Sequence, residues 1–376
     1  MRRLNVAFIG AGFMAKAHAL ACRSFAAVFP DAPAHPHLHT ICARASDEEV
    51  AGAARRFGFE KWTTDVAEVV TNREIDVVFV LTPNDSHRDL AVLAAEHGKH
   101  VLCEKPMAMH AAEAAEMVRA VESAGVRGML CFTYRRTPAV IYARKLLDEG
   151  TFGRPYAFRG FYLQDWSADS EVPFVWRFDR AVAGTGTLGD IGSHVLDFAH
   201  YLFGSVRSVN AVLATWIDAR PGSDGAVKHS VQVDDELLCT MRFENGAVGS
   251  IQASRNALGR KNYLGFELNC ENGSLFFDYE RMNELRVCRR GDRDEDFQTI
   301  HIGPDHPYGT HFWPIPALGI GYTELKLIEV YDFLDGVIAG HDPEPSFRAG
   351  LENQRVLDAM AESAAKRTWV DVTQGS

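Results

Sequence analysis

The sequence has no long hydrophobic run and no pair of cysteines in metal-binding spacing. A membrane-spanning helix needs about 20 consecutive apolar residues, and no stretch approaches that length. The seven cysteines are scattered, odd in number and never spaced as C-x-x-C, which indicates free thiols in a reducing compartment. The apolar run in the N-terminal MRRLNVAFIGAG is too short for a signal peptide. We therefore expect a cytoplasmic protein without a membrane partner and without a bound metal.

An excess of basic residues is also missing. The 376 residues include 39 Lys and Arg against 50 Asp and Glu, which gives a net charge of −11. No basic run offsets this charge, so the sequence argues against a nucleic acid partner. Hydrophobic residues make up 47% and charged residues 24%, the balance of a soluble globular protein. The length allows two or three domains.

The first third of the chain alternates short apolar runs with helical periods. This alternation predicts a parallel, doubly wound α/β sheet. Residues 30–39 contain three histidines, and we interpret them as a polar loop rather than a metal site. The predicted strands cover 4–9, 38–42, 76–81, 100–103 and 128–132, and the predicted helices cover 13–25, 47–57, 86–96 and 111–124.

The pattern changes after residue 133 to longer strands with alternating polarity. A helix is inserted near 190–203, and helices return at 323–339 and 347–365. The segment ENGAVG at 244–249 is typical of a hairpin turn. We therefore predict a second, α+β domain over residues 134–376, with an open and mostly antiparallel sheet.

A glycine-rich turn follows the first predicted strand and opens a helix. Its sequence from Gly10 to Ala15 fits G-x-G-x-x-A. Gly10 permits a tight turn, Gly12 lets the backbone approach a pyrophosphate, and Ala15 allows close helix–strand packing. The helix N-terminus adds N–H donors and a positive dipole for phosphates. We therefore predict that residues 1–133 form a Rossmann domain that binds NAD or NADP.

The end of the second strand leaves the choice between these cofactors open. An NAD site usually has Asp or Glu here, which accepts a hydrogen bond from the ribose 2′-hydroxyl. Ala43 cannot accept one, and Arg44 could hold the 2′-phosphate of NADP. The local sequence favours NADP slightly, and NAD remains open.

Two further stretches carry acid–base residues. In VLCEKPMAMH, an apolar strand ends at Glu104, Lys105 and Pro106, at the sheet edge where ligands bind in open α/β sheets. In TLGDIGSHVLDFAHYLFG, Asp190 and His194 lie four residues apart, a spacing that puts both on one helix face. The preceding GTGTLG suggests a flexible approach for a substrate. Histidine exchanges protons near neutral pH, and Asp190 could orient it.

Taken together, these motifs resemble the glucose–fructose oxidoreductase / inositol dehydrogenase (Gfo/Idh/MocA) family. The match includes Gly10–Ala15, Thr82-Pro83-Asn84, Glu104-Lys105-Pro106 and G-D-x-G-S-H-x-x-D at Gly189–Asp197. It covers nearly the whole chain in order and spacing. The resemblance implies that Lys105, Asp190 and His194 are catalytic, with nicotinamide against Lys105. It also implies a homodimer or homotetramer formed through the C-terminal sheet, and we expect a cis Lys105–Pro106 bond.

A finer resemblance is to sugar dehydrogenases of the levoglucosan dehydrogenase type, which use NAD and oxidise a ring hydroxyl. It rests on the segments Tyr134–Pro138, Tyr162–Asp169, Trp176-Arg177 and Trp313–Tyr322. Aromatic side chains in them offer flat faces to sugar C–H groups, and polar ones offer hydrogen bonds. Cofactor contacts are expected from Gly10, Gly12, Phe13, Met14, Arg44, Thr82, Pro83, Asn84, His87, Glu104, Lys105, Trp176 and Arg177. Substrate contacts are expected from Tyr134, Arg135, Gln164, Asp165, Trp166, Asp190, His194 and Tyr322.

These observations predict an NAD(P)-dependent oxidoreductase that moves hydride between nicotinamide and a ring hydroxyl of a sugar or polyol. The ring could be a pyranose, an anhydrosugar, a glycoside or an inositol. One alternative is a non-catalytic sensor of NAD(P) or sugar, against which the set Lys105, Asp190 and His194 argues. The other is a cofactor-assisted glycosidase, which would release an aglycone without net reduction of the cofactor.

Overall fold

The chain is described from a computed structural model that covers residues 2–223, 225, 227–312, 314–315 and 318–373. It divides into two compact units, one formed by residues up to 136 with 320–351, the other by 137–319 with the residues from 352 onward. The predicted boundaries, 1–133 and 134–376, gave residues 320–351 to the second domain, whereas the structure gives them to the first unit. No helix among the described residues is long and apolar enough to cross a membrane.

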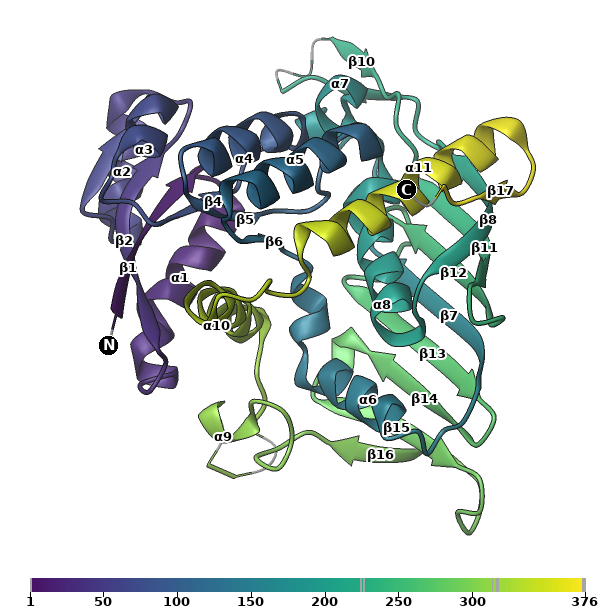
Figure 1. The fold of residues 1–376 in the computed structure, drawn as a ribbon. Coiled ribbons are helices and arrows are strands. Elements are labelled where there is room, and N and C mark those ends of the chain that lie inside the picture. Colours follow the sequence, from purple (N-terminus) through teal and green to yellow (C-terminus); the bar gives the residue numbers. More distant parts are fainter. Residues whose placement is uncertain (1, 224, 226, 313, 316–317, 374–376) are drawn as a thin grey trace. The chain divides into compact units, whose positions relative to one another are not determined.

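The first unit is built on a six-stranded parallel sheet with strand order β3-β2-β1-β4-β5-β6 (Figure 1). The order reverses between β1 and β4, and ligands bind at the strand carboxyl ends beside such a switch point. The doubly wound sheet is confirmed. Its strands are β1 (Arg2–Ile9), β2 (Ala34–Cys42), β3 (Lys61–Thr63), β4 (Val77–Val80), β5 (His100–Cys103) and β6 (Gly128–Leu130). Its helices are α1 (Phe13–Val28), α2 (Asp47–Phe57), α3 (Val66–Thr71), α4 (His87–Glu96), α5 (Ala111–Ala124), α10 (Tyr322–Ala339) and the start of α11 (Phe347–Lys366).

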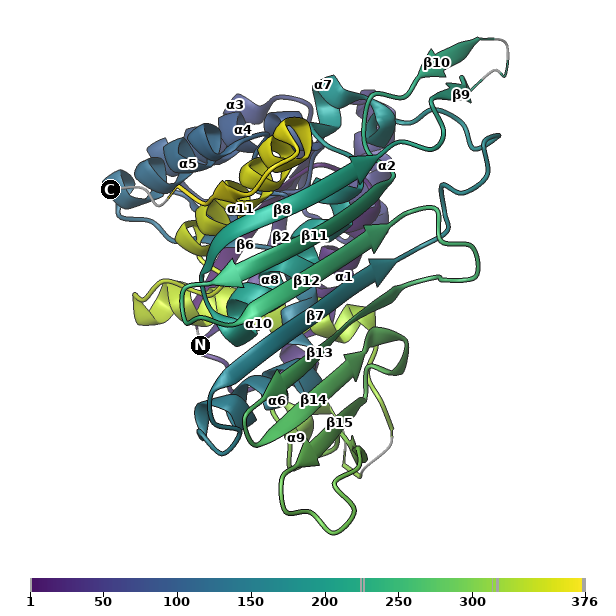
Figure 2. The ribbon, with the colours of Figure 1, turned by 90° about the vertical axis from the view of Figure 1, so that its right-hand side faces the viewer.

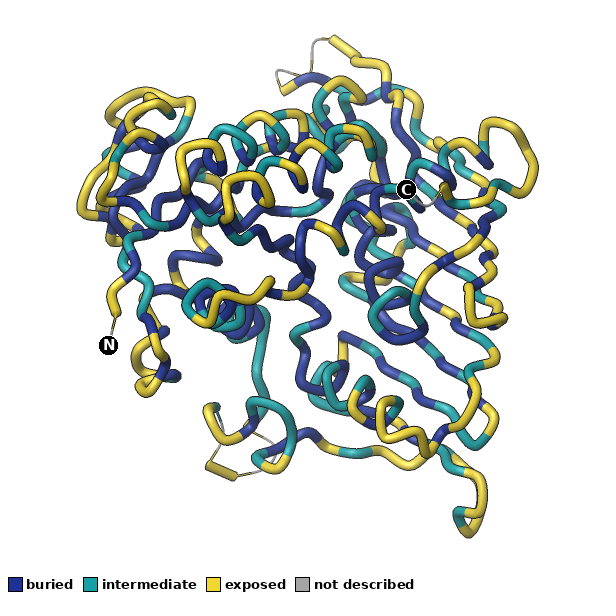
Figure 3. Tube along the Cα trace, viewed as in Figure 1, coloured by how far each residue is buried: buried dark blue, intermediate teal, exposed yellow. Residues whose placement is uncertain are grey.

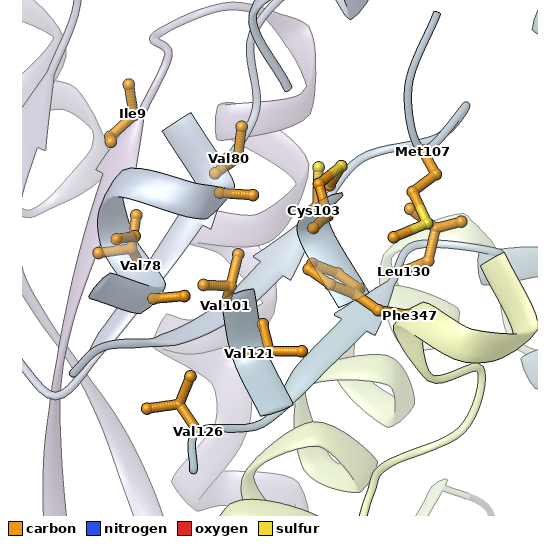
Figure 4. Packing of buried hydrophobic residues seen from close by; sticks show 14 of the residues in the cluster. Ile9, Val78, Val80, Val101, Cys103, Met107, Val121, Val126, Leu130 and Phe347 are labelled. Carbon is orange, nitrogen blue, oxygen red and sulfur yellow. The ribbon is translucent and has the colours of Figure 1, made fainter. Parts of the chain in front are cut away.

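The central strands of this sheet are buried at every position or nearly so. All four residues of β4 are buried, as expected for a strand covered on both faces. Figure 4 shows Val78, Val80 and Val101 in one apolar cluster that also contains Phe347 at the start of α11. Gly128 on β6 allows that approach, because a Cβ there would lie 2.7 Å from the Phe347 ring.

The polar segment 30–39 is a loop only in its first part. Strand β2 begins at Ala34 and pairs with β1, with His35 opposite Arg3 and Pro36 opposite Leu4. Strand β3 pairs with β2 only from Thr40 onward. Pro36 therefore lies where β2 is an edge strand, and an edge tolerates proline. The loop prediction was wrong here because the strand carries proline and histidine where its outer edge has no partner strand.

The second unit is built on a nine-stranded sheet of order β16-β15-β14-β13-β7-β12-β11-β8-β17, in which only β12 and β7 pair in parallel. The predicted hairpin at 244–249 joins β11 and β12. The strands are β7 (Pro155–Leu163), β8 (Val206–Ala214), β11 (Glu236–Phe243), β12 (Val248–Ser254), β13 (Tyr263–Cys270), β14 (Gly273–Asp278), β15 (Glu284–Arg289), β16 (Gln298–His301) and β17 (Val370–Asp371), with a separate ribbon of β9 (Ala219–Pro221) and β10 (Lys228–Ser230). The helices are α6 (Pro138–Asp148), α7 (Arg180–Ala183), α8 (Ser193–Phe203), α9 (Gly309–Phe312) and the rest of α11.

The two faces of this sheet differ. Helix α8 packs on β7, β12 and β13 and is buried almost throughout (Figure 3). It lies so close to β7 that a Cβ on Gly160 would be 2.3 Å from Val195. Figure 2 looks onto the opposite face of the sheet. Val212, Leu238 and Val248, on strands β8, β11 and β12, have exposed side chains.

A buried ion-pair network explains why α10 belongs to the first unit. Lys326 Nζ lies 2.9 Å from Glu104 Oε1 and 2.8 Å from Glu329 Oε2. His18 Nε2 lies 3.1 Å from the same Glu104 oxygen, and Thr133 donates to Glu329. Burial opposes the charge on Lys326, but the two glutamates raise its pKa well above the usual value. Helix α10 is thereby tied to the end of β5, where Glu104 follows the strand.

We expect Lys326→Met to destabilise the protein by about 3–5 kcal/mol, because it leaves two buried carboxylates without their cation. Urea unfolding followed by circular dichroism measures this change. The control is Lys61→Met, which removes the largely exposed pair with Glu74 and should cost under about 1 kcal/mol. Equal losses in the two variants would contradict the role given to the network.

Candidate active site

The glycine-rich turn of the first unit has the geometry of a phosphate-binding loop. Gly10 has a φ of +119°, and a Cβ there would lie 2.5 Å from the carbonyl oxygen of Leu81. Gly12 is the N-cap residue of α1, and a Cβ on it would meet nothing within 4 Å. The first turn of α1 has neither a side-chain cap nor an acidic residue. Nothing in this turn therefore competes with an anion for the helix N-terminus, and a dinucleotide pyrophosphate fits the residues present.

The end of β2 has an acidic neighbour that the sequence interpretation missed. Arg44 is exposed in the bend after β2, and its predicted contact with the cofactor stays a prediction. Helix α2 then begins with a capping box between Ser46 and Glu49 and has three acidic residues in its first turn. The hydrogen bond from Ser46 lowers the pKa of Glu49, which favours its charged form. A cavity of about 570 Å³ beside this turn is lined by Ala11, Ala45, Glu49, Val50, Gly52, Ala53 and Arg56.

The turn that carries Lys105 lies against the side chain of His87. The Lys105–Pro106 peptide bond is cis, which confirms that expectation. His87 Nδ1 lies 2.8 Å from the carbonyl oxygen of Pro106, and its Nε2 lies 2.9 Å from that of Thr82. The buried imidazole thus joins the Thr82-Pro83-Asn84 loop to the Lys105 turn. Its predicted contact with the cofactor stays a prediction.

Glu104 is held by contacts on both carboxylate oxygens, and its predicted contact with the cofactor stays a prediction. One of its carboxylate oxygens lies against His18 and Lys326, and the other accepts from the Lys105 N–H at 3.4 Å. Burial opposes the charge, but Lys326 and His18 hold the pKa of Glu104 well below its usual range. His18, Glu104 and Cys131 bring three possible metal-ligand atoms within 4.8 Å of one another. The Lys326 ammonium already occupies that carboxylate, and its positive charge opposes a metal cation.

Three predicted residues meet at the start of α10. The rings of Tyr134 and Tyr322 lie 6.2 Å apart, and the Tyr322 hydroxyl lies 3.9 Å from Met14 Sδ. Burial raises the pKa of Tyr322 well above its usual value, so this phenol stays neutral. Arg135 is buried in the same short turn as Tyr134. Residues 313, 316 and 317 of the motif that ends at Tyr322 lie outside the described residues.

In the second unit, Asp190 and His194 follow each other along one helical segment. Asp190 lies in a π-helical turn, Leu188–Gly192, that leads directly into α8. Such turns occur often at functional sites. His194 is buried, and its ring lies 6.0 Å from that of Tyr162 on β7. The shared helical segment was predicted, whereas the π turn was not, because its residues fit an ordinary helix equally well.

The prediction that GTGTLG is flexible was wrong. Asp234 accepts hydrogen bonds from the N–H groups of Gly186, at 2.8 Å, and Leu188, at 2.7 Å. Thr187 donates to the Asp234 and Asp235 carbonyls. A Cβ on Gly186 would lie 1.9 Å from the Asp234 carbonyl oxygen. The small residues therefore permit close backbone approach, and Asp234 holds the turn that precedes Asp190.

Two guanidinium groups flank the Asp190 carboxylate. Arg177 Nε lies 3.9 Å from Asp190 Oδ2, and Arg255 Nη1 lies 3.6 Å from the same oxygen. The Arg177 guanidinium stacks on Trp176, with its Cζ 4.4 Å from the ring centroid. Arg177 and Trp176 were predicted to contact the cofactor, and that role stays a prediction. Arg255 was missed, because no pattern around it distinguishes it from a surface arginine.

The predicted substrate residues after β7 contact a loop that the sequence interpretation passed over. Gln164 Nε2 donates to Asn262 Oδ1 at 3.0 Å, and the Tyr162 hydroxyl donates to the same oxygen at 2.6 Å. Asp165 accepts from Lys261 Nζ at 2.6 Å, a bond that lowers the pKa of Asp165. Trp166 packs on Phe178, with ring centroids 5.5 Å apart.

We expect Gly186→Ala to destabilise the protein by about 1–3 kcal/mol, since the added methyl overlaps the Asp234 carbonyl. Urea unfolding measures the change. The matched control is Gly52→Ala in α2, where the nearest atom to a Cβ is 4.0 Å away and alanine should stabilise the helix by up to about 1 kcal/mol. A Gly186→Ala protein as stable as the wild type would mean that the turn adapts freely.

The comparisons with known proteins cover both units. Residues 4–132 match the family described as "Oxidoreductase family, NAD-binding Rossmann fold", and residues 140–276 match "GFO/IDH/MocA C-terminal domain". Levoglucosan dehydrogenase from Pseudarthrobacter phenanthrenivorans is 48% identical over 100% of this chain and 99% of its own length. The scyllo-inositol 2-dehydrogenase (NAD(+)) of Bacillus subtilis is 30% identical over 77% of this chain and 75% of its own.

Solved structures agree. A levoglucosan dehydrogenase in complex with NADH and L-sorbose has a TM-score of 0.97 at 48% identity, with 100% of both chains covered. A complex with NADH and levoglucosan has a TM-score of 0.96 at 49% identity, with 99% of this chain and 100% of that chain covered. Since both family domains match in their expected order and a relative matches from end to end, the chain belongs to the Gfo/Idh/MocA family of oxidoreductases with an NAD-binding Rossmann domain.

Proposed function

We propose that this protein is an NAD-dependent dehydrogenase that oxidises a ring hydroxyl of a sugar, with anhydrosugars such as levoglucosan as the first substrates to test. The observation that carries the proposal is the end-to-end likeness to levoglucosan dehydrogenase at 48% identity. The local arrangement supports it, because a buried histidine follows a carboxylate that two guanidinium groups flank.

In the proposed mechanism, bound NAD⁺ accepts the hydride from the carbinol carbon of the sugar. The His194 imidazole removes the proton of the hydroxyl that is oxidised. The Lys105 ammonium donates a hydrogen bond to the same oxygen and stabilises the negative charge that develops on it. Asp190 orients the imidazole and balances its positive charge after proton transfer. Glu104 acts on Lys105 through the backbone N–H that it accepts from.

The preference for NAD over NADP rests on the first turn of α2. Glu49 lines the cavity beside the glycine-rich turn, and two further acids precede it. The Glu49 carboxylate in this cavity repels a 2′-phosphate and is compatible with a ribose hydroxyl. Arg44 then contacts the adenosine end without selecting NADP. The slight preference for NADP inferred from Ala43 and Arg44 is thereby reversed.

The open face of the second unit supports assembly. We propose a homodimer or homotetramer formed through the sheet that carries Val212, Leu238 and Val248, which are apolar and exposed. Large exposed apolar patches commonly mark protein interfaces. A cytoplasmic location is proposed from the seven free cysteines, since a reducing compartment keeps thiols unpaired.

The test is a screen of anhydrosugars, monosaccharides, glycosides and inositols with NAD⁺ and with NADP⁺, followed by the absorbance of the reduced cofactor. The proposal expects NADH formation with at least one ring hydroxyl substrate. Release of an aglycone without net reduction would identify a glycosidase instead. Tight binding of sugar or cofactor without any turnover would identify a sensor.

We expect His194→Asn to lower kcat for sugar oxidation by about 10²–10⁴-fold, because asparagine hydrogen-bonds but cannot take the proton. In the wild type, the oxidation rate should rise with pH, since only the neutral imidazole accepts a proton. Steady-state kinetics across pH measures both effects. His200→Asn, six residues further along α8, is the control and should keep the wild-type rate and profile. A His194→Asn enzyme with normal kcat would move the base elsewhere.

We expect the wild type to prefer NAD⁺, and Glu49→Gln to improve kcat/KM for NADP⁺ by about five- to tenfold, the size of one removed charge repulsion near the surface. Glutamine still fits a capping box, so the helix start should persist. Glu48→Gln in the same turn, which does not line the cavity, is the control. A wild-type preference for NADP⁺ would mean that Arg44 holds the 2′-phosphate after all.

A further inference from the structure

The second unit buries two arginine side chains completely, Arg220 and Arg255. Arginine stays charged in proteins and is almost never fully buried unless it is paired. Both guanidinium groups pack on the ring of Phe178, with Cζ distances to its centroid of 4.2 Å for Arg220 and 5.5 Å for Arg255. They therefore share an environment, and they differ in what their nitrogen atoms contact.

Arg220 donates hydrogen bonds to the backbone of one loop. Its Nη1 donates to the carbonyl oxygen of Asp169 at 2.8 Å, and its Nη2 donates to that of Ser167. Both acceptors lie in the segment that follows β7. Its contacts are those of a structural arginine that holds a loop in place.

Arg255 is placed differently. Its Nη2 donates to the carbonyl oxygen of Asp234 at 3.2 Å, and its Nη1 lies 3.6 Å from Asp190 Oδ2. Within the described residues, Nε and Nη1 have no hydrogen-bond partner. The ring of Trp166 lies 5.3 Å from Cζ and covers another part of the group. The carboxylate that Nη1 faces is that of Asp190.

The backbone of Arg255 is fixed by the segment that also fixes the Asp190 turn. Its N–H donates to the carbonyl oxygen of Asp235 at 3.2 Å, and its own carbonyl accepts from the Ser167 N–H at 3.2 Å. Asp234 holds the turn before Asp190 through Gly186 and Leu188. The adjacent residues Asp234 and Asp235 thus contact both the turn that precedes the carboxylate and the backbone of the cation beside it.

This arrangement is poorly suited to stabilising the fold. A buried ion pair with incomplete hydrogen bonding often contributes less stability than apolar residues of the same size. What it supplies is a fixed positive charge beside a carboxylate in a medium of low dielectric constant, where charges interact strongly. Such a charge restricts where the carboxylate can lie.

We infer that Arg255 is a positioning residue for the oxidation proposed above: its buried guanidinium fixes the Asp190 carboxylate, which in turn orients His194. Arg177 is the second and looser partner, since its side chain is 43% exposed and that of Arg255 is 0% exposed. The inference rests on the proposed function, because its effect is on the rate of that reaction.

The test is a double-mutant cycle of Arg255→Lys and Arg255→Met with Asp190→Asn, using the sugar and cofactor that the wild type turns over. We expect Arg255→Met to lower kcat by about 10²-fold, the loss that a displacement of about 1 Å can cause, with the KM for NAD⁺ nearly unchanged. Arg255→Lys keeps the charge and should lose less. In the Asp190→Asn background, both substitutions should add a loss of less than about threefold, because residues that act through one contact are not additive.

Arg220→Met is the matched control, since it removes a guanidinium group that is equally buried and packs on the same Phe178 ring. It should lower stability but keep kcat within about threefold of wild type. Additive losses in the cycle, or an equal kcat loss in Arg220→Met, would overturn the inference while leaving the proposed function intact. A wild type that oxidises no sugar would overturn both. If Arg255→Met does not fold, the Arg255→Lys arm of the cycle decides.

Discussion

The pairing of Glu104 with Lys326 is the constraint on which the first unit depends. A carboxylate at the end of a buried strand cannot stay charged without a cation, and the chain supplies that cation from a helix more than two hundred residues later. The pairing fixes three things together: the end of β5, the docking of α10 and the backbone that presents Lys105. His87 adds a second brace to the same turn from the next loop.

The second unit also contains a buried carboxylate, and there backbone N–H groups stabilise it. Asp234 accepts from two of them, and glycine at 186 lets the chains approach closely enough for those bonds to form. Burial raises the pKa of Asp234, while the same hydrogen bonds favour its charged form. In the first unit Lys105 directly follows the buried Glu104, and in the second unit Asp190 lies two residues after Leu188, whose N–H donates to the buried Asp234. Rigid support of this kind is what keeps reactive side chains in a productive geometry.

Much of this could be predicted from sequence, where the signal is local. The parallel sheet, the glycine-rich turn, the hairpin at 244–249 and the cis bond before Pro106 each depend on a few adjacent residues. Family membership was recognised from motifs whose order and spacing are themselves sequence features. The catalytic roles of Lys105, Asp190 and His194 remain predictions that the proposed kinetics test.

The missed features are long-range contacts between residues with no distinctive local pattern. Lys326 sits in an apolar helix, where its spacing gives no hint of Glu104. Arg255 follows a strand end, where arginine is usually exposed. The glycines of GTGTLG suggest freedom of movement until the Asp234 carboxylate is brought beside them by the fold. The acidic first turn of α2 was visible in the sequence, but its bearing on cofactor choice required the cavity that Glu49 lines.

Residues 320–351 belong to the first unit, although residues 137–319 of the second unit precede them in the chain. This order limits how the gene can recombine. The chain passes between the units three times, after residues 136, 319 and 351, so the nucleotide-binding half is not an independent N-terminal cassette. A recombination that exchanged only residues before 137 would combine Glu104 and His18 from one parent with Lys326 and Glu329 from the other. Recombination between relatives is therefore expected to give a stable protein only when both parents have this buried charge pattern. Substitutions at Glu104 and at Lys326 must accordingly occur together.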